Sequence, residues 1–275
     1  MAHRPIVTLT TDFGINDHFV GAVKGVILDI VPEATIVDIS HAVQAFDVLD
    51  GALTISQTYS YFPTGTVHLI VVDPGVGTAR RPIIASSDGY HFVAPDNGVL
   101  SMVYAREERM AVRHVTGEHY FRQPVSNTFH GRDIFAPVAA YLAKQVDSHK
   151  FGDEIQDYVR FAAPKPKPAG DNRVRAVVLK VDRFGNLITN VTPEDLPALF
   201  TGKSGFKIVV GSKEITEIRT AYAEGAPGEV FGILGSMGYL EIVANRAAAT
   251  QITGAGKGSE VSIVLGEGAA AGKGA

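Results

Sequence analysis

The sequence predicts an α/β fold class: an N-terminal α/β/α domain with a mostly parallel sheet, followed by a C-terminal all-β, barrel-like domain. In the N-terminal part, apolar runs of strand length alternate with segments of helical apolar spacing, a pattern typical of sheets covered on both faces. Proline and lysine then alternate in APKPKPAG (residues 163–170), which indicates a stiff, solvated linker. Short strand patterns separated by turns follow. We therefore expect domains at residues 1–163 and 173–266, a linker at 164–172 and a flexible tail at 267–275.

The individual elements follow from apolar spacing and from residues that break helices. The first expected helix has apolar residues at helical spacing and ends before Pro32, because the residue before a proline disfavours helical backbone. Asp88-Gly89 lies between two apolar runs and favours a hairpin. In the first domain we expect strands at residues 6–10, 35–40, 69–72, 83–86 and 91–94, and helices at 17–30, 46–59, 99–106 and 133–145. In the second domain we expect strands at residues 173–182, 187–190, 207–210, 229–234, 240–243 and 260–265.

The composition excludes several classes of protein. A net charge of −4 over 275 residues gives no basic surface for nucleic acid. No apolar run reaches the ~18 residues that cross a membrane. The absence of cysteine excludes disulfides, thiolate nucleophiles and cysteine-bound zinc. The nine histidines show no spacing such as HExxH, so we expect no catalytic metal. Without a signal-peptide core at the N-terminus, we expect a soluble, cytoplasmic protein with no nucleic-acid or membrane partner.

The stretch HLIVVDPGVGTARR contains the strongest candidate site. Its apolar run predicts a buried parallel strand, with Asp73 at the carboxyl end and Arg80 and Arg81 shortly after a glycine-rich turn. Ligands bind just outside the carboxyl ends of strands in open α/β sheets. A carboxylate and a guanidinium at that edge therefore indicate a binding or catalytic site. The alternative is that Asp73 caps the turn and the arginines are solvated.

Two further polar residues of the first domain follow expected strands or precede expected helices. Asp12 ends the first strand in TTDFG, where a carboxylate accepts hydrogen bonds from both hydroxyls of a ribose in nucleotide-binding folds. Its alternative role is a turn or helix cap. His130 lies in NTFHGRD and is either a general base or electrostatic partner, or a hydrogen-bonded core histidine.

Two turns of the second domain carry candidate binding residues. In DRFGN, Asp182 suits an amine, Phe184 an aromatic base and Asn186 the edge of a base. In GSMGYL, which includes Ser236 and Tyr239, exposed backbone donors suit a carboxylate. The alternative for both segments is a well-formed turn without a ligand.

Together these motifs resemble the SAM hydroxide adenosyltransferases, which are S-adenosylmethionine hydrolases that form adenosine and are related to fluorinases and chlorinases. The resemblance covers nearly the whole chain, in the family's order. The blocks that carry it are TTDFGINDHFVGAVKGV, YFPTGTVHLIVVDPGVGTARR, FVAPDNGVL, NTFHGRDIFAP, VDRFGNLITN and GSMGYLEIVANR. It implies an N-terminal α/β domain, a C-terminal β-barrel and a homotrimer. The ligand would lie between the N-terminal domain of one subunit and the C-terminal domain of the next.

By motif position, the resemblance implies a catalytic triad around the nucleophilic water. The triad residues are Asp73, Arg80 and His130, with Arg80 a better match than Arg81. The resemblance also implies the following substrate contacts: Asp12 and Phe62 at the ribose, Asp182 at the methionine, Asn186 at the adenine and Ser236 at the methionine carboxylate. Phe184 and Tyr239 complete the expected substrate-binding set.

The implied reaction is hydrolysis of S-adenosyl-L-methionine to adenosine and L-methionine, without a metal or cofactor. One alternative is halogenation of the same carbon by chloride or fluoride, and another is a non-catalytic adenosine-binding protein. Met237 and Ala244 stand where fluorinases have arginines, and Gly131 stands where fluorinases have the serine that helps hold halide. These departures disfavour halogenation.

Overall fold

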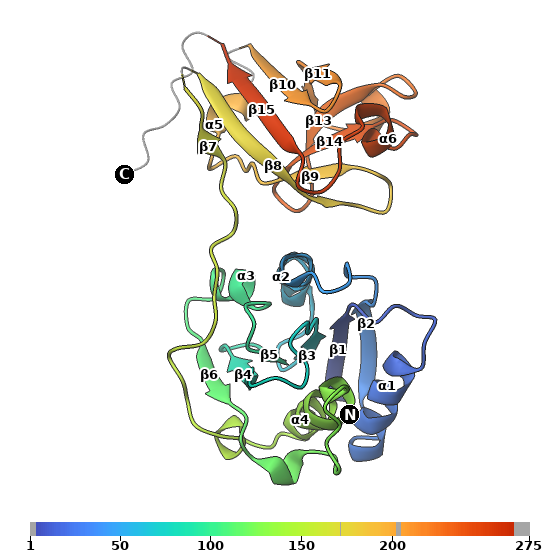
Figure 1. Ribbon diagram of the computed structural model, residues 1–275, viewed down its shortest axis with the longest axis vertical. Coiled ribbons are helices and arrows are strands. Elements are labelled where there is room, and N and C mark those ends of the chain that lie inside the picture. Colours follow the sequence, from blue (N-terminus) through green and yellow to red (C-terminus); the bar gives the residue numbers. More distant parts are fainter. Residues whose placement is uncertain (1–3, 171, 202–204, 267–275) are drawn as a thin grey trace. The chain divides into compact units, whose positions relative to one another are not determined.

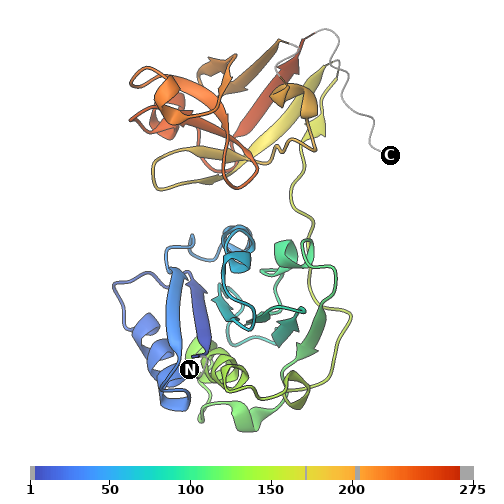
Figure 2. The same ribbon diagram turned by 180° about the vertical axis from the view of Figure 1, so that it is seen from behind.

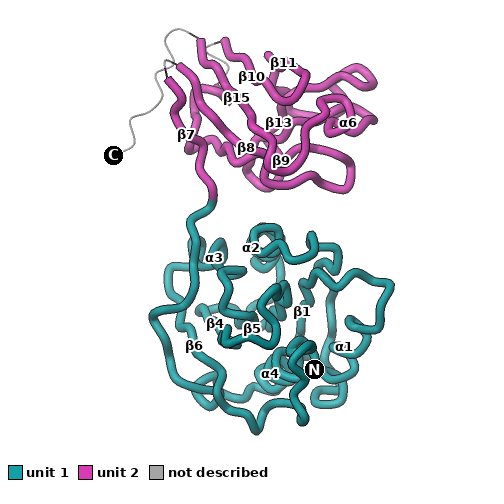
Figure 3. Tube along the Cα trace, viewed as in Figure 1, with its two compact units in different colours: residues 1–163 teal, residues 164–275 magenta. Residues whose placement is uncertain are grey.

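The computed structural model describes residues 4–170, 172–201 and 205–266. The chain divides into two compact units, Met1–Ala163 and Pro164–Ala275, which Figure 3 colours separately. The tail expected at residues 267–275 lies outside the described residues. Within the described part, no helix is both long and apolar enough to cross a membrane.

A six-stranded sheet forms the centre of unit 1 (Figure 1). Its strands are β1 (Ile6–Thr11), β2 (Thr35–Ser40), β3 (Val67–Val71), β4 (Pro82–Ser86), β5 (His91–Pro95) and β6 (Ala111–His114). Their spatial order is β2-β1-β3-β5-β4-β6. β2, β1, β3 and β5 pair in parallel, while β4 is antiparallel to both of its neighbours. The predicted mostly parallel sheet is confirmed.

Helices cover both faces of this sheet. The regular helices are α1 (Phe19–Ile30), α2 (Val48–Ser56), α3 (Ser101–Tyr104) and α4 (Ala136–Ala143), with short turns η1 (Tyr59–Tyr61), η2 (Glu118–Tyr120), η3 (Gly131–Phe135) and η4 (Ser148–Lys150). Residues of α1 and α4 share one apolar core with the sheet, and residues of α2 and α3 share the other. The two views in Figures 1 and 2 show α1 and α4 side by side. Unit 1 is therefore a three-layer α/β/α sandwich.

The central strand β3 contributes to both cores. Leu69 and Val71 belong to the core under α1 and α4, while Ile70 and the following Val72 belong to the core under α2 and α3. All four side chains are at most 2% exposed. Successive side chains of a strand point to opposite faces, so the backbone before Asp73 is fixed from both sides.

Two segments of unit 1 differ from the helices expected from the sequence. The helix expected at 46–59 covers only Val48–Ser56. It cannot start at Phe46, because Phe46 has φ 65°, a left-handed conformation that a helix excludes. Asp47 caps this helix by accepting from the Asp50 amide. The helix expected at 133–145 begins earlier, as the π-helical turn η3. Such π turns occur often at functional sites.

Unit 2 is built on a nine-stranded, curled and barrel-like sheet. Its strands are β7 (Lys167–Pro168), β8 (Arg173–Val181), β9 (Leu187–Thr189), β10 (Phe206–Val210), β11 (Lys213–Ile215), β12 (Ile218–Arg219), β13 (Val230–Leu234), β14 (Leu240–Ala244) and β15 (Glu260–Leu265). The path is β11-β10-β15-β8-β9-β14-β13-β12, and β7 pairs with β8. Three short helices accompany the sheet: α5 (Pro197–Phe200), η5 (Tyr222–Glu224) and α6 (Ala249–Thr253).

Part of the stretch expected as a linker forms β7. Its two residues, Lys167 and Pro168, are exposed but pair antiparallel with β8. A proline is tolerated at the edge of a sheet because it needs no ladder partner on its solvent side.

Candidate active site

Three predicted residues lie in contact just beyond the carboxyl end of β3. The Arg80 guanidinium donates from Nε to both oxygens of Asp73, at 3.0 and 2.9 Å, and from Nη2 to Asp73 Oδ2. Arg80 Nη2 also lies 2.7 Å from Nδ1 of His130. The side chains of Asp73 and Arg80 are only 5% and 9% exposed. A guanidinium held on both oxygens of a carboxylate has little rotational freedom. Arg80 therefore fixes the relative positions of Asp73 and His130.

The loop after β3 folds back tightly enough to return Arg80 to Asp73. Successive turns are closed by hydrogen bonds from Val76 N to Asp73 O and from Thr78 N to Gly75 O. Gly77 has φ 77°, and a Cβ there would collide with the carbonyl oxygen of Asn127. Only glycine tolerates both conditions, so Gly77 lets this loop approach the loop that carries His130.

The contact with Arg80 determines where His130 carries its proton. A guanidinium only donates, so Nδ1 of His130 must accept and the neutral ring carries its hydrogen on Nε2. Burial lowers the pKa of His130, and the positive charge of Arg80 lowers it further. The imidazole is therefore neutral near pH 7 and presents an N–H donor on its other side.

A cavity of about 260 Å³ adjoins this group. Its polar lining includes Asp12, Asp73, Thr128 and His130. The apolar part of the lining consists of Phe13, Phe19, Ala45, Phe46, Val71, Val76, Phe129 and Gly131. A largely apolar cavity with a few convergent polar groups is the usual form of a small-molecule site.

Asp12 lies in this cavity with part of its hydrogen-bonding capacity used. The amide of Phe46 donates to Asp12 Oδ2 at 2.9 Å. Burial raises the pKa of Asp12 and the charge of Asp73 adds to the rise, while the Phe46 amide opposes it. The remaining lone pairs of the carboxylate can accept from hydroxyl groups of a ligand.

One nitrogen of Arg80 has no partner. Nη1 is buried and makes no hydrogen bond to any of the described residues. The guanidinium carbon lies 5.0 Å from the centre of the Phe135 ring. A buried donor without a partner costs free energy, and a ligand or a water molecule would satisfy it.

Arg81, the neighbouring arginine, has a different environment. Its Nε donates to Asp96 at 2.8 Å and its Nη1 donates to Asp157 at 2.8 Å. These bonds raise the pKa of Arg81. Arg81 thus joins Asp96 to the segment before the linker and does not line the cavity of Asp73 and His130.

Phe62 is not brought to this cavity. Its ring lies 5.7 Å from the ring of the buried His68, and its carbonyl accepts from the Tyr90 hydroxyl at 3.0 Å. Within the described chain, Phe62 does not line the cavity that holds Asp12.

In unit 2, the DRFGN segment forms a tight turn around Asp182. Asp182 Oδ1 accepts from the amides of Phe184 and Asn186, both at 2.8 Å, and Oδ2 accepts from Asn186 Nδ2 at 2.9 Å. The Phe184 side chain is 77% exposed, whereas Asn186 is buried. Phe184 and Asn186 border a cavity of about 520 Å³, whose other lining residues are Tyr222, Ala244, Arg246, Ala247 and Ala248.

Ser236 and Tyr239 lie in the turn between β13 and β14. Gly235 N donates to Tyr239 O and Gly238 N donates to Gly235 O, both at 2.9 Å. Ser236 is exposed and Tyr239 is half-buried. Neither residue lines the 520 Å³ cavity.

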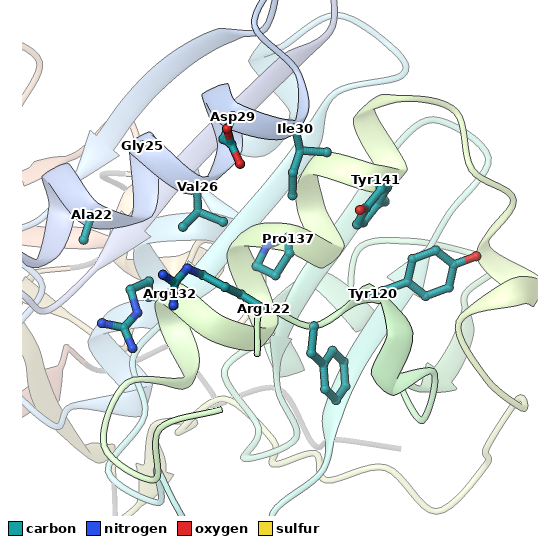
Figure 4. A pocket seen from close by; sticks show the side chains of 11 residues that line it. Ala22, Gly25, Val26, Asp29, Ile30, Tyr120, Arg122, Arg132, Pro137 and Tyr141 are labelled. Carbon is teal, nitrogen blue, oxygen red and sulfur yellow. The ribbon is translucent and has the colours of Figure 1, made fainter. Parts of the chain in front are cut away.

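A third hollow, of about 480 Å³, lies on unit 1 between α1, α4 and the segment around Tyr120. Figure 4 shows Arg122 and Arg132 close together in its wall. Both pair with Asp133, at 3.6 and 2.7 Å. No residue expected from the sequence lines this hollow.

Sequence reasoning missed the aromatic lining of the first cavity and Tyr222 in the second. Phe13 directly follows Asp12, and Phe129 directly precedes His130. Their place next to these candidate residues in the sequence could have predicted that they line the cavity. Phe46 precedes α2 and Tyr222 begins the short helix η5; neither belongs to a motif, and nothing in their local sequence marks them.

Comparison with known proteins agrees with the motif resemblance. The SAM hydroxide adenosyltransferase N-terminal domain matches residues 7–152, and the C-terminal domain of the same family matches residues 176–262. An "(R)-S-adenosyl-L-methionine hydrolase" of Salinispora tropica is 36% identical over 97% of this chain and 100% of its own length. A "Fluorinase" of Nocardia brasiliensis is 30% identical, over 89% of this chain and 92% of its own length.

A solved structure shows the same fold. The crystal structure of an uncharacterized conserved protein from Thermotoga maritima superposes with a TM-score of 0.85 and 36% identity, covering 94% of this chain and 99% of that chain. Two consecutive domain matches, in the order expected from the motifs, span most of the sequence. The chain belongs to the SAM hydroxide adenosyltransferase family.

Proposed function

We propose that the chain hydrolyses S-adenosyl-L-methionine to adenosine and L-methionine. The observation that carries this proposal is the buried chain of contacts from Asp73 through Arg80 to His130, at the wall of a cavity that also holds Asp12. The relatives named (R)-S-adenosyl-L-methionine hydrolase, at 32–37% identity, support it.

The reaction needs a nucleophile more than it needs a better leaving group. Water attacks C5′ in line, the new O–C5′ bond forms, and the electrons of the C5′–S bond remain on sulfur as the neutral thioether of methionine. One proton of the water passes to solvent. Water is a poor nucleophile, with a pKa of about 15.7, so the protein must stabilise its hydroxide-like form.

Arg80 and His130 supply that stabilisation. In this proposal the oxygen of the attacking water accepts from Nε2–H of His130, which lines the cavity, and from Nη1 of Arg80, which has no partner among the described residues. Fixed donors in a buried site stabilise developing negative charge without the reorganisation that solvent requires. Asp73 holds Arg80 in place, and a water positioned ~3–3.5 Å from C5′ reacts as part of an almost unimolecular step.

Binding of the substrate involves residues of both units. Asp12, which lines the 260 Å³ cavity, accepts from the ribose hydroxyls. In unit 2, Asn186 and Phe184 contact the adenine; this assignment is supported by their position at the 520 Å³ cavity. The methionine moiety is held by Asp182, Ser236 and Tyr239.

The test is chromatography of the products formed from purified protein and S-adenosyl-L-methionine. Wild type should release adenosine and L-methionine in equal amounts. Asp73→Ala, Arg80→Ala and His130→Ala should each lower turnover strongly while adenosine binding survives. Arg81→Gln is the matched control, because it removes a neighbouring guanidinium that pairs elsewhere. Unchanged adenosine release in all three triad variants would refute the assignment.

A halogenase is the second candidate, favoured only by the similarity to a fluorinase. Gly131 lies against aromatic rings, and a Cβ there would come within 3.2 Å of the Phe13 ring. A serine at this position would therefore have to displace Phe13. Incubation with chloride or fluoride separates the two functions, because a halogenase forms a halogenated nucleoside where the hydrolase forms adenosine. A non-catalytic adenosine-binding protein would form neither.

We further propose that the active assembly is a cytoplasmic homotrimer that uses no metal or cofactor. The family resemblance supports the trimer. Light scattering after size-exclusion chromatography tests the assembly, cell fractionation tests the location, and activity after treatment with a chelator tests the absence of a metal requirement.

A further inference from the structure

Two neighbouring loops of unit 1 form part of the wall of the 260 Å³ cavity. The loop after β1 contributes Asp12 and Phe13 to the lining, and the loop after β2 contributes Ala45 and Phe46. The two strands pair in parallel, so both loops leave the sheet at the same edge, where ligands bind in open α/β sheets. The shape of this wall therefore depends on how the two loops are joined.

Backbone and side-chain hydrogen bonds join the two loops. The amide of Gly14 donates to the carbonyl of His41 at 2.7 Å. The amide of Phe46 donates to Asp12 Oδ2 at 2.9 Å. A side-chain contact adds to these bonds, because Thr11 Oγ1 lies 2.9 Å from His41 Nδ1. The loop that carries Asp12 is thus fastened to its neighbour both before and after the carboxylate.

His41 is buried between Thr11 and the exposed Asp38. The His41 side chain is only 5% exposed, and its Nε2 lies 3.0 Å from Asp38 Oδ1. This second contact is electrostatic, because it does not meet the geometry of a hydrogen bond. Lys24 Nζ donates to the other oxygen of Asp38 at 2.6 Å. A carboxylate beside Nε2 favours the ring hydrogen on that nitrogen, which leaves Nδ1 to accept from the Thr11 hydroxyl.

The Thr11 hydroxyl connects the histidine to the cavity wall. It donates its hydrogen to His41 Nδ1 and accepts from the amide of Phe13 at 3.3 Å. The hydroxyl thereby closes a short turn whose middle residue is Asp12, so a shift of Thr11 Oγ1 moves the backbone that bears the carboxylate. Within the described chain, His41 itself does not line the cavity. Any effect of His41 on a ligand must therefore pass through this turn.

We propose that His41 is a positioning residue, which acts through Thr11 to orient the Asp12 carboxylate toward the ribose hydroxyls of the substrate. Hydrogen bonds weaken steeply when their angle falls below ~120°, so a small rotation of Asp12 is enough to lose this recognition. The Phe46 amide fixes one oxygen of Asp12, while the direction of the second oxygen depends on the backbone of the turn. This inference rests on the proposed function, because it names the ribose of the proposed substrate.

The test compares S-adenosyl-L-methionine with its 2′-deoxy analogue in wild type, Thr11→Val, His41→Leu and His41→Asn. Valine keeps the shape of threonine without the hydroxyl, leucine removes both ring nitrogens, and asparagine keeps an acceptor near the position of Nδ1. Thr8→Val is the matched control, because Thr8 lies on the same strand, is equally buried and bonds Nδ1 of another buried histidine, His68, at 2.7 Å. The quantity measured is kcat/KM for nucleoside release, below the melting temperature of each variant.

Wild type should prefer S-adenosyl-L-methionine over the analogue by about tenfold or more, since the analogue lacks a hydrogen bond to a charged group. Thr11→Val and His41→Leu should lower kcat/KM for S-adenosyl-L-methionine by about fivefold and that for the analogue by less than about twofold, so that the preference shrinks. His41→Asn and Thr8→Val should keep the wild-type preference. Equal losses on both compounds in Thr11→Val, or a smaller preference in Thr8→Val as well, would overturn the inference.

A melting experiment separates positioning from general stability. Thr11→Val and Thr8→Val each remove one buried hydroxyl that contacts a histidine, so their melting temperatures should fall by similar amounts while only Thr11→Val changes the preference. If His41→Leu does not fold, the isosteric Thr11→Val carries the test. A preference that follows the melting temperature across all variants would assign His41 to structure and overturn the inference. Failure of the proposed function looks different, since wild type would then release no nucleoside from either compound.

Discussion

Replacing Asp73 with asparagine should destabilise unit 1 and abolish turnover, and the two losses should be separable. Asparagine keeps the size of the side chain but leaves the Arg80 guanidinium as a buried charge without a counterion. The two side chains are 5% and 9% exposed, so solvent cannot replace the lost charge. Removing one partner of a buried pair costs about 3–5 kcal/mol. For a unit of this size, each kcal/mol lowers Tm by roughly 2–4 °C, so Tm should fall by about 6–20 °C.

The double variant Asp73→Asn/Arg80→Met removes the orphaned charge as well. Methionine fills much of the arginine's apolar volume beside Phe135, which contacts the guanidinium. Stability should therefore return to within about 1–2 kcal/mol of wild type, since buried pairs replaced by apolar groups are often neutral. Turnover should stay at the level of the single variant, because the donors for the attacking water are gone.

The assay is calorimetric melting together with chromatographic measurement of adenosine. A loss of less than about 1 kcal/mol for Asp73→Asn, the value of an exposed pair, would refute the reasoning from burial. Recovery of activity in the double variant would refute the catalytic role of Arg80.

Three other perturbations test the loop, the histidine and the core. His130→Gln keeps a hydrogen-bond donor but cannot titrate. In wild type, protonation of His130 should lower the activity at acidic pH, and the weaker activity of the variant should not show this loss. A pH–rate profile of the variant that falls at acidic pH as in wild type would contradict this prediction. Gly77→Ala should lower the free energy of unfolding in urea by roughly 2–4 kcal/mol, because of left-handed backbone strain and the collision with Asn127. An unchanged free energy of unfolding would show that the loop does not require glycine at position 77. Burial lowers the pKa of His68 to about 3, below its value near 6.5 in the unfolded chain; folding stability should therefore fall by about 1.4 kcal/mol per pH unit from pH 6.5 toward 4. His68→Gln should show a correspondingly smaller slope, and equal slopes would count against this account.

The sequence predicted the fold class because its signals are local. The alternation of strands and helices, the Asp88-Gly89 hairpin and the turn-rich second half all depend on neighbouring residues. The hairpin is present as β4 and β5, and the sheet of unit 1 is mostly parallel as expected. The edge strands β6 and β11 gave no comparable signal, since charged residues interrupt the apolar pattern in both (AVRH and KEI).

The candidate site was harder to predict because contacts depend on how loops fold. The six residues between Asp73 and Arg80 permit their contact, but only the backbone at Gly77 shows that the loop closes against Asn127. The sequence offered two readings of Asp182, as a ligand-binding acid or as a turn residue, and in the structure it caps its own turn.

The position of Asp73 after β3 has a consequence for how this enzyme family can vary. The strand that precedes Asp73 packs against two separate apolar cores, one on each face of the sheet. A cavity created in either core would therefore shift the Asp73 carboxylate. Phe46, by contrast, is 73% exposed, bends through a left-handed backbone and borders the same cavity. Substitutions at Phe46 can therefore change the shape of this cavity while the position of the Asp73 carboxylate stays the same.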